Sequence, residues 1–151
     1  MSQIPKISLE YLIKNDQDSI LTLSEALANH GFFVITDHAI PHDLFDKAYE
    51  YSKKFFDLDI SKKNAYSFRE NAGARGYTPF GKETALGETV PDLKEFWHHG
   101  PVVDSSFDSR ILKNVHVDEI DNFNNIFDEL FDQMNSLGMK LLESISLTLG
   151  L

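Results

Sequence analysis

The chain has 151 residues and no cysteine, and its 14 lysines and arginines against 24 aspartates and glutamates give a formal net charge of −10. The lack of cysteine excludes disulfides, thiolate metal sites and cysteine nucleophiles, and an acidic surface disfavours binding to nucleic acid or to anionic membranes. The N-terminus has no basic segment followed by an apolar run, and no stretch approaches the roughly 18 apolar residues of a membrane span, so we expect a cytoplasmic protein.

The first elements are short and alternate between strand and helix. Residues Pro5–Leu9 alternate apolar and polar side chains and predict a strand. A helix is expected after the capping side chains of Asn15–Asp18, with its end at Gly31, which accepts positive φ without steric cost. The aromatic and β-branched run Phe32–Thr36 then predicts a buried strand.

A second helix is expected from Ile40 onward, with Pro41 near its first turn. Ser61 is positioned to cap a short helical turn after it. Glycines and prolines are frequent from Glu70 to Pro101, which predicts loops and short strands. Functional side chains tend to lie in such segments. The apolar face of the second helix consists of Leu44, Phe45, Ala48, Tyr51 and Phe55.

The last segment gives the clearest helical pattern, because apolar residues recur at spacings of three and four from Ile120 to Leu149. Asp118 or Asp121 could cap its start, and Gly150 could end it. Such a helix would be roughly 45 Å long, at 1.5 Å per residue. A helix of that length normally lies against a larger body than the rest of this chain supplies.

Read in order, these segments resemble the N-terminal region of the isopenicillin N synthase-like oxygenases, which use iron(II) and 2-oxoglutarate. The order and spacing of the blocks together carry the resemblance. Ser8 and Ala39 depart from the family pattern, at positions that carry no chemistry. The blocks that carry the resemblance are Ile4–Leu9, His30–Ile35, Asp37–Pro41, Phe55–Leu58, Arg75–Gly81, Asp92–Trp97 and the closing helix to Leu151.

The resemblance implies an α+β fold in which N-terminal helices and short strands flank a double-stranded β-helix, or jelly roll. In the family that jelly roll follows the long helix, and it holds the non-haem iron through a His-x-Asp pair and a distant histidine. An Arg-x-Ser pair further on holds 2-oxoglutarate. We therefore expect residues 1–151 to be the N-terminal domain of such a dioxygenase, with the catalytic half missing and no iron or 2-oxoglutarate bound by this portion alone.

One His-x-Asp sequence does occur, at His116-Val117-Asp118. Side chains at i and i+2 of a strand share a face and could bind one metal. A facial triad needs a third ligand, and no histidine follows Asp118. The family's pair also lies after the long helix, whereas this one precedes it. We favour the interpretation that His116 is a surface residue and Asp118 a helix cap.

His98 and His99 are adjacent, so on a strand they point to opposite faces and would rarely bind one metal. We expect them at a loop or strand end. The neighbouring Lys94–Trp97 segment looks structural, with Phe96 and Trp97 packing against the missing core and Lys94 and Glu95 forming salt bridges.

Arg75 and Tyr77 are the candidate substrate-binding residues. The resemblance implies that their loop covers the mouth of the active site, where an arginine or tyrosine of some members binds a substrate carboxylate. A guanidinium suits that task because it pairs with two oxygens at once. The alternative is a turn with a packed aromatic ring.

We thus expect the parent protein to oxidise a small organic substrate with iron(II), 2-oxoglutarate and O₂, and the 151-residue chain alone to be inactive. Oxidase or cyclase chemistry without 2-oxoglutarate stays open, because such members exist. The alternative function is a non-catalytic binding or scaffold module. Its partner at the C-terminal helix would be a separate catalytic half or a second copy of the chain, since an exposed apolar face needs a partner.

Overall fold

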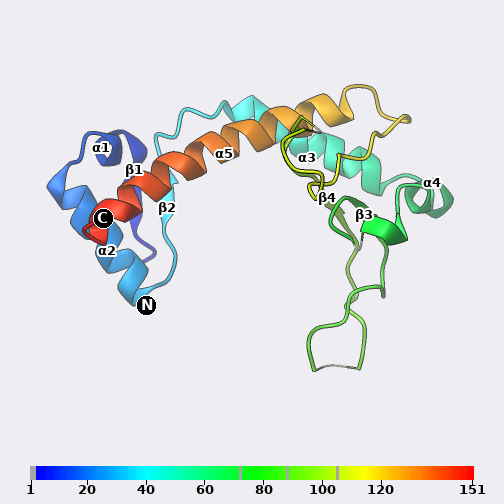
Figure 1. Cartoon of the computed structure of the whole chain (residues 1–151), viewed down its shortest axis with the longest axis horizontal. Coiled ribbons are helices and arrows are strands. Elements are labelled where there is room, and N and C mark those ends of the chain that lie inside the picture. Colours follow the sequence, from blue (N-terminus) through cyan, green and yellow to red (C-terminus); the bar gives the residue numbers. More distant parts are fainter. Residues whose placement is uncertain (1–2, 72, 88, 105) are drawn as a thin grey trace. The chain divides into compact units, whose positions relative to one another are not determined.

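A computed structural model describes residues 3–71, 73–87, 89–104 and 106–151 (Figure 1). The mixture of helices and a few short strands agrees with the expected α+β class. The elements in chain order are β1 (Lys6–Ser8), α1 (Leu9–Ile13), α2 (Gln17–Asn29), β2 (Val34–Thr36), α3 (His42–Phe56), α4 (Ile60–Asn64), the 3₁₀ helix η1 (Arg69–Asn71), β3 (Gly76–Thr78), β4 (Phe96–His98) and α5 (Phe123–Thr148).

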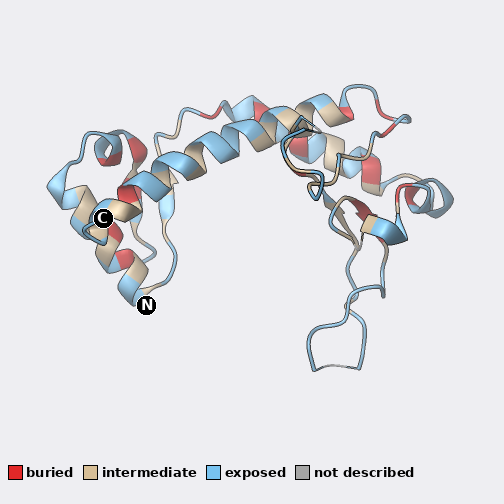
Figure 2. Ribbon diagram, viewed as in Figure 1, coloured by how far each residue is buried: buried red, intermediate tan, exposed pale blue. Residues whose placement is uncertain are grey.

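The chain divides into two compact units. The terminal unit consists of Met1–Pro41 together with Gln133–Leu151, and the central unit consists of His42–Asp132. Each unit has its own cluster of buried apolar side chains (Figure 2). Helix α5 contributes its first residues to the central unit and its last residues to the terminal unit.

The terminal unit is built on a parallel pair of strands, β1 and β2, with Ile7 opposite Ile35. Helix α1, which the sequence pattern did not predict, follows β1 directly. The cluster of this unit is aliphatic, and the last turns of α5 contribute to it. Its buried members are Ile7, Leu12, Leu23 and Ala26, with Ile20, Leu27, Phe33, Ile35, Leu141 and Ile145 packed around them.

The expectation of a buried strand over Phe32–Thr36 is wrong in part. The strand begins only at Val34, whose exposed fraction is 41%, and Phe32 is 55% exposed. The pleat explains the difference, since Phe33 and Ile35 point to one face and pack on the aliphatic cluster while Phe32 and Val34 point to the other.

Helix α2 starts and ends as its sequence predicts. The carboxylate of Asp16 accepts a hydrogen bond from the backbone N–H of Ser19 at 3.0 Å, which satisfies one of the free N–H groups of the first turn. Gly31 follows the helix with φ of 73°, the left-handed conformation that commonly terminates helices.

The central unit is built around aromatic rings. Phe55 of α3 is fully buried, and its ring centroid lies 4.7 Å from Trp97 and 5.5 Å from Phe123. Trp97 therefore packs on the aromatic cluster of this chain, and the expectation that it also contacts a core outside these residues stays a prediction. The buried members of this aromatic cluster are Phe55, Tyr66, Tyr77, Val117, Ile120 and Phe123, with Tyr51, Phe56, Leu58, Trp97, Val115 and Phe127 packed against them.

Helix α4 starts after Asp59, so Ser61 lies within the helix and does not cap it, contrary to the expectation.

The start of β3 is a sterically tight position. Gly76 opens this strand with φ of 83°, and a Cβ atom there would lie 2.5 Å from the backbone oxygen of Tyr66. Only glycine fits this position, because the conflicting atom belongs to the backbone.

Helix α5 begins later than predicted. Asn122 has φ of 64°, a left-handed conformation that a continuous helix cannot include, so neither Asp118 nor Asp121 caps the start at Phe123. The helix ends before Gly150, which has the expected positive φ. Its 26 residues correspond to about 39 Å. Among the described residues, no helix combines the length and apolarity that crossing a bilayer requires.

Candidate functional site

The strongest concentration of buried polar chemistry lies behind the antiparallel pair β3–β4 of the central unit, in which Tyr77 faces Trp97. Lys63 of α4 reaches Glu95 with its Nζ 2.9 Å from Oε2, and it also donates to the carbonyl of Phe56 at 3.0 Å. The hydroxyl of Tyr77 donates to the same carboxylate. These three residues form a closed set in which the ammonium, the carboxylate and the phenol satisfy one another.

The environment shifts the protonation equilibria within this set. Burial raises the pKa of the Glu95 carboxyl, but the hydrogen bond from Tyr77 and the ammonium of Lys63 outweigh burial and hold that pKa below its ordinary value. Burial raises the pKa of Tyr77, and the hydrogen bond to Glu95 raises it further. The set therefore remains a phenol beside a carboxylate at neutral pH.

An open groove lies on the other side of this strand pair, with a volume of ≈ 630 Å³. That volume falls within the range of small-molecule sites in proteins. Its walls combine aromatic rings with hydroxyl, amide and cationic groups. The lining residues are Asn64, Ser67, Phe68, Arg69, Gly73, Tyr77, Thr78, Pro79, Lys82, Glu83, Phe96 and His98.

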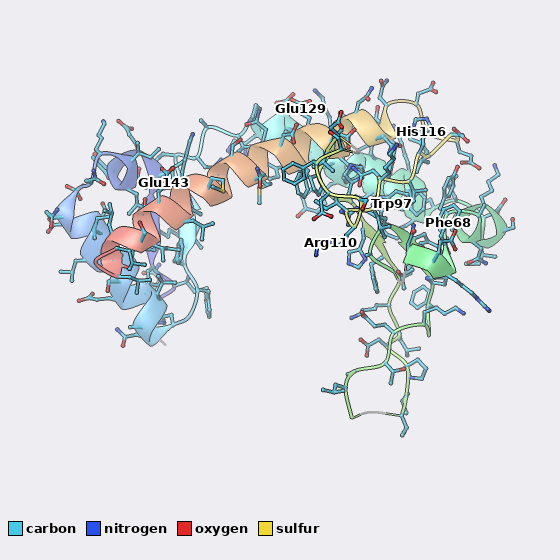
Figure 3. The ribbon with its side chains drawn as sticks, viewed as in Figure 1. Phe68, Trp97, Arg110, His116, Glu129 and Glu143 are labelled. Atoms are coloured by element: carbon cyan, nitrogen blue, oxygen red, sulfur yellow. The ribbon has the colours of Figure 1, made fainter. Side chains whose placement is uncertain are left out.

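Tyr77, one of the two predicted substrate contacts, is only 1% exposed and contributes to the lining of this groove. Its hydroxyl is engaged by Glu95 and is therefore not free to bind a ligand in the groove. Trp97, whose place on β4 is labelled in Figure 3, packs on the side of the strand pair that faces the aromatic cluster.

Arg75, the other predicted contact, is not among the groove residues. Its guanidinium lies directly against the Cα of Gly100, where any added Cβ would overlap Cζ, Nη2 and Nε. Nη1 donates to the carbonyl of Ala74 at 2.5 Å, while the buried Nε has no hydrogen-bond partner among the described residues. The edge of the fork that pairs best with a carboxylate is thus covered by Gly100 in this structure.

A network of polar side chains fixes Gly100 in turn. The amide of Asn114 accepts from the backbone N–H of Gly100 and donates to its carbonyl, both at 2.8 Å. The Nδ2 group also donates to Asp128 of α5 at 3.2 Å. Asn114 therefore ties the end of β4 to the start of α5, and it fixes the surface on which Arg75 lies.

The two adjacent histidines have separate environments, as their alternation on a strand predicts. The side chain of His99 is only 8% exposed, and its Nε2 donates to Asp128 at 2.6 Å. His98 is exposed, and its ring lies 4.8 Å from that of Phe96. Because the carbonyl of Gly73 can only accept, the 2.5 Å contact with Nδ1 of His98 places a hydrogen on that nitrogen.

His116 and Asp118 share one face, with Nε2 3.6 Å from Oδ1, and both side chains are largely exposed. Figure 3 labels His116 in the segment that precedes α5. Within the described part of the chain, no group of three histidine or carboxylate side chains is arranged to hold a metal ion. This donor set does not fit the facial triad of a non-haem iron centre, which needs three ligands on one side of the metal.

Several charged residues of the site, Arg69 and Lys82 among them, were not identified as site residues from the sequence, and only Glu95 had a usable signal. In a strand, Glu95 must share a face with Trp97, and that pairing would have predicted a buried carboxylate in need of a cation. Arg69 and Lys82 lie in irregular segments, where no periodicity indicates the direction of a side chain. The expected salt bridges of Lys94 and Glu95 are both present.

Comparison with known proteins gives a consistent result. Residues 4–119 match the family model described as "non-haem dioxygenase in morphine synthesis N-terminal". Gibberellin 20 oxidase 1 of Arabidopsis thaliana is 29% identical over 97% of this chain and 40% of its own length. A 2-oxoglutarate-dependent dioxygenase of Didymella fabae is 31% identical over 65% of this chain and 29% of its own length.

Among solved structures, a crystal structure assigned to the 2OG-Fe(II) oxygenase family from Caulobacter crescentus superposes with a TM-score of 0.85. It is 33% identical to this chain, and the match covers 100% of this chain and 50% of the other. The chain thus spans half or less of the length of these similar proteins.

Proposed function

This chain belongs to the family of non-haem dioxygenase N-terminal domains, and from that membership we propose that it is the N-terminal part of an iron(II)- and 2-oxoglutarate-dependent dioxygenase that oxidises a small organic substrate. The observation that carries the proposal is the family match over residues 4–119. The likeness to the Caulobacter protein supports it over the full chain.

We further propose that iron(II) and 2-oxoglutarate are bound by a jelly-roll half outside these 151 residues, and that this chain alone has no turnover. The relatives extend well beyond the matched region, which supports this division. When bound, the two groups supply the activation of O₂. The described residues would supply the wall of a substrate pocket, and no step of the oxidation is assigned to them.

Within that wall we propose Arg75 and Tyr77 as substrate contacts. The two differ in whether a side-chain movement is needed before contact. Tyr77 is already among the residues that line the groove. Arg75 would reach a substrate only after its guanidinium leaves Gly100, a movement that the flexible side chain permits. The neighbouring pair of Lys63 and Glu95 holds the hydroxyl of Tyr77 in place.

The test of this function compares the product of the complete gene with the 151-residue chain. Both are incubated with iron(II), 2-oxoglutarate and O₂ in the presence of a panel of small acids, and succinate is measured. We expect succinate from the complete product only. Turnover by the 151 residues alone would contradict the proposed division, and a complete product that neither binds 2-oxoglutarate nor forms succinate would contradict the enzyme assignment.

A second candidate, a non-catalytic module that binds a separate chain, is favoured by exposed apolar residues on the C-terminal half of α5. Met139 is 54% exposed, Leu142 60% and Leu147 47%. An apolar helix face of this kind is a common protein-binding surface. Sedimentation of the 151-residue chain, alone and with its separately expressed C-terminal half, tests this candidate. Association that the Leu142→Glu variant abolishes would support this candidate. A chain that stays monomeric and does not bind the C-terminal half would contradict it.

A further inference from the structure

We propose that the groove beside β3 and β4 binds a small carboxylic acid with an apolar body, and that Arg69, assisted by Lys82, recognises its carboxylate. The inference rests on the proposed function in one respect, namely that this acid belongs to the substrate class of the parent enzyme. Binding itself can be measured on the 151-residue chain without any turnover.

The charges of the groove support an anionic ligand. Arg69 and Lys82 line it, and neither has an ion-pair partner among the described residues, although the chain has a net charge of −10. The one carboxylate in the lining, Glu83, is paired with Lys94 at 2.8 Å. Lys94 also pairs with Asp92 at 2.9 Å, so it offsets one of these two carboxylates, whereas Arg69 and Lys82 are the lining charges without an ion-pair partner among the described residues. A guanidinium binds a carboxylate through two parallel hydrogen bonds, which makes Arg69 the specific member of the two.

The remaining lining supports an apolar body beside the charge. Phe68, labelled in Figure 3, is 38% exposed, lines the groove and directly precedes η1 in the chain. Phe96 and Pro79 present further apolar surface, and the contact between Phe96 and His98 fixes that ring at the edge of β4. Aromatic walls are a poor environment for a compact, fully hydrated anion, whereas they bury the ring or chain of an organic acid.

One polar group in the groove lacks a partner. Thr78 lines the groove with a residue exposure of only 9%, and its buried hydroxyl has no hydrogen-bond partner among the described residues. Buried hydroxyls are nearly always satisfied, so this one leaves unused hydrogen-bonding capacity directly beneath the groove surface.

The structure also distinguishes the two candidate arginines. The sequence favoured Arg75 as the carboxylate-binding residue, whereas the structure favours Arg69. Arg75 does not line the groove, and its carboxylate-binding edge is covered by Gly100. Arg69 lines the groove in the structure as it stands. Recognition by Arg69 therefore requires no prior movement, while recognition by Arg75 requires one.

The test is a titration of the ¹⁵N-labelled 151-residue chain followed by NMR, with phenylacetate as the acid probe and phenylacetamide as its neutral counterpart. We expect phenylacetate to shift the amides around Arg69, Thr78 and Lys82, and phenylacetamide to bind more weakly. Arg69→Gln should weaken phenylacetate binding about fivefold, a magnitude typical of a solvated charge pair. The matched control Arg110→Gln, whose side chain is 89% exposed and outside the groove, should leave binding unchanged.

Several outcomes overturn the inference. Equal binding of the acid and the amide would remove the role of charge, and equal shifts with inorganic phosphate would reduce the site to a general anion patch. A larger loss with Arg75→Gln than with Arg69→Gln would transfer the role to Arg75. If phenylacetate shifts no amide signal up to its solubility limit, the groove does not bind such acids. The proposed function is tested separately, by succinate formation from the complete gene product.

Discussion

The two units of this chain bury different kinds of side chain, and the difference separates packing from chemistry. The terminal unit closes on aliphatic residues such as Leu12 and Leu23, which carry no polar atoms. The central unit closes on Phe55, Tyr66 and Tyr77, and the two tyrosines bring hydroxyl groups that must find partners. Tyr66 donates to Glu119 and Tyr77 to Glu95. The aromatic cluster therefore brings carboxylates to its edge, of which Glu95 is largely buried and Glu119 is exposed, and the candidate site lies in the central unit.

The largest expected effect comes from Phe55→Ala, which removes the ring that contacts Tyr66, Trp97 and Phe123 together. We expect a loss of about 3–5 kcal/mol in the free energy of unfolding, since the surrounding rings cannot close the cavity. The measurement is urea unfolding followed by fluorescence of Trp97, the single tryptophan of the chain. The matched change in the terminal unit, Leu23→Ala, should shift the far-UV circular dichroism transition more than the fluorescence transition. Equal shifts in both signals for both variants would contradict separate clusters.

The next effect tests the charges of the central unit. Lys63→Met removes the cation from Glu95 and leaves the carboxylate with Tyr77 alone, so we expect a loss of about 2–4 kcal/mol, near the lower range for breaking a buried pair. The double variant Lys63→Met with Glu95→Gln should recover part of this loss, because the amide still accepts from Tyr77 and carries no charge. Thermal unfolding at neutral pH measures both. A double variant less stable than the single one would contradict the account.

A smaller effect concerns pH. The pKa of Glu95 is lower in the folded protein than its ordinary value of 4.5, so ionised Glu95 stabilises the fold above that pH. This contribution is lost as the pH falls below 4.5 through the folded-state pKa, when the carboxylate takes up a proton. Glu95→Gln should flatten this part of the stability profile. Chemical unfolding between neutral pH and pH 3 measures it, and an unchanged slope in the variant would contradict a role for Glu95.

The smallest effect lies in the terminal unit and involves no buried charge. Asp16→Ala removes the side chain that caps α2 and should cost about 1 kcal/mol. Asp16→Asn keeps an oxygen acceptor and should restore most of the stability, which distinguishes the cap from a general effect of charge. Circular dichroism on thermal unfolding is the measurement. An alanine variant as stable as the parent would show that the first turn of α2 is satisfied by water.

Sequence patterns predicted the elements with strong local causes. The cap at Asp16, the stop at Gly31, the face of α3 and the stop at Gly150 all depend on residues within a few positions of one another. The patterns failed where distant residues decide. The start of α5 depends on the left-handed conformation of Asn122, which apolar spacing does not report.

The candidate site likewise combines residues that the sequence could indicate with residues that only the fold brings together. Arg75 and Tyr77 follow from the resemblance, and the structure places only Tyr77 in the groove wall. Arg69 lies in a short 3₁₀ turn and reaches the groove because η1, β3 and β4 come together, an arrangement of segments about 27 residues apart along the chain. No local pattern encodes such an arrangement, so the groove could be recognised only after folding.

The order of the two units along the chain has a consequence for synthesis. The central unit is continuous, whereas the terminal unit needs Leu141 and Ile145 of α5 to cover the cluster around Leu12 and Leu23. Translation proceeds from the N-terminus, so the first 41 residues leave the ribosome long before the helix that covers them. Until Leu141 and Ile145 are synthesised, the aliphatic side chains of these 41 residues lack the part of α5 that packs on them. During that interval the nascent N-terminal segment is the natural target for a chaperone or a protease, and completion of α5 ends its exposure.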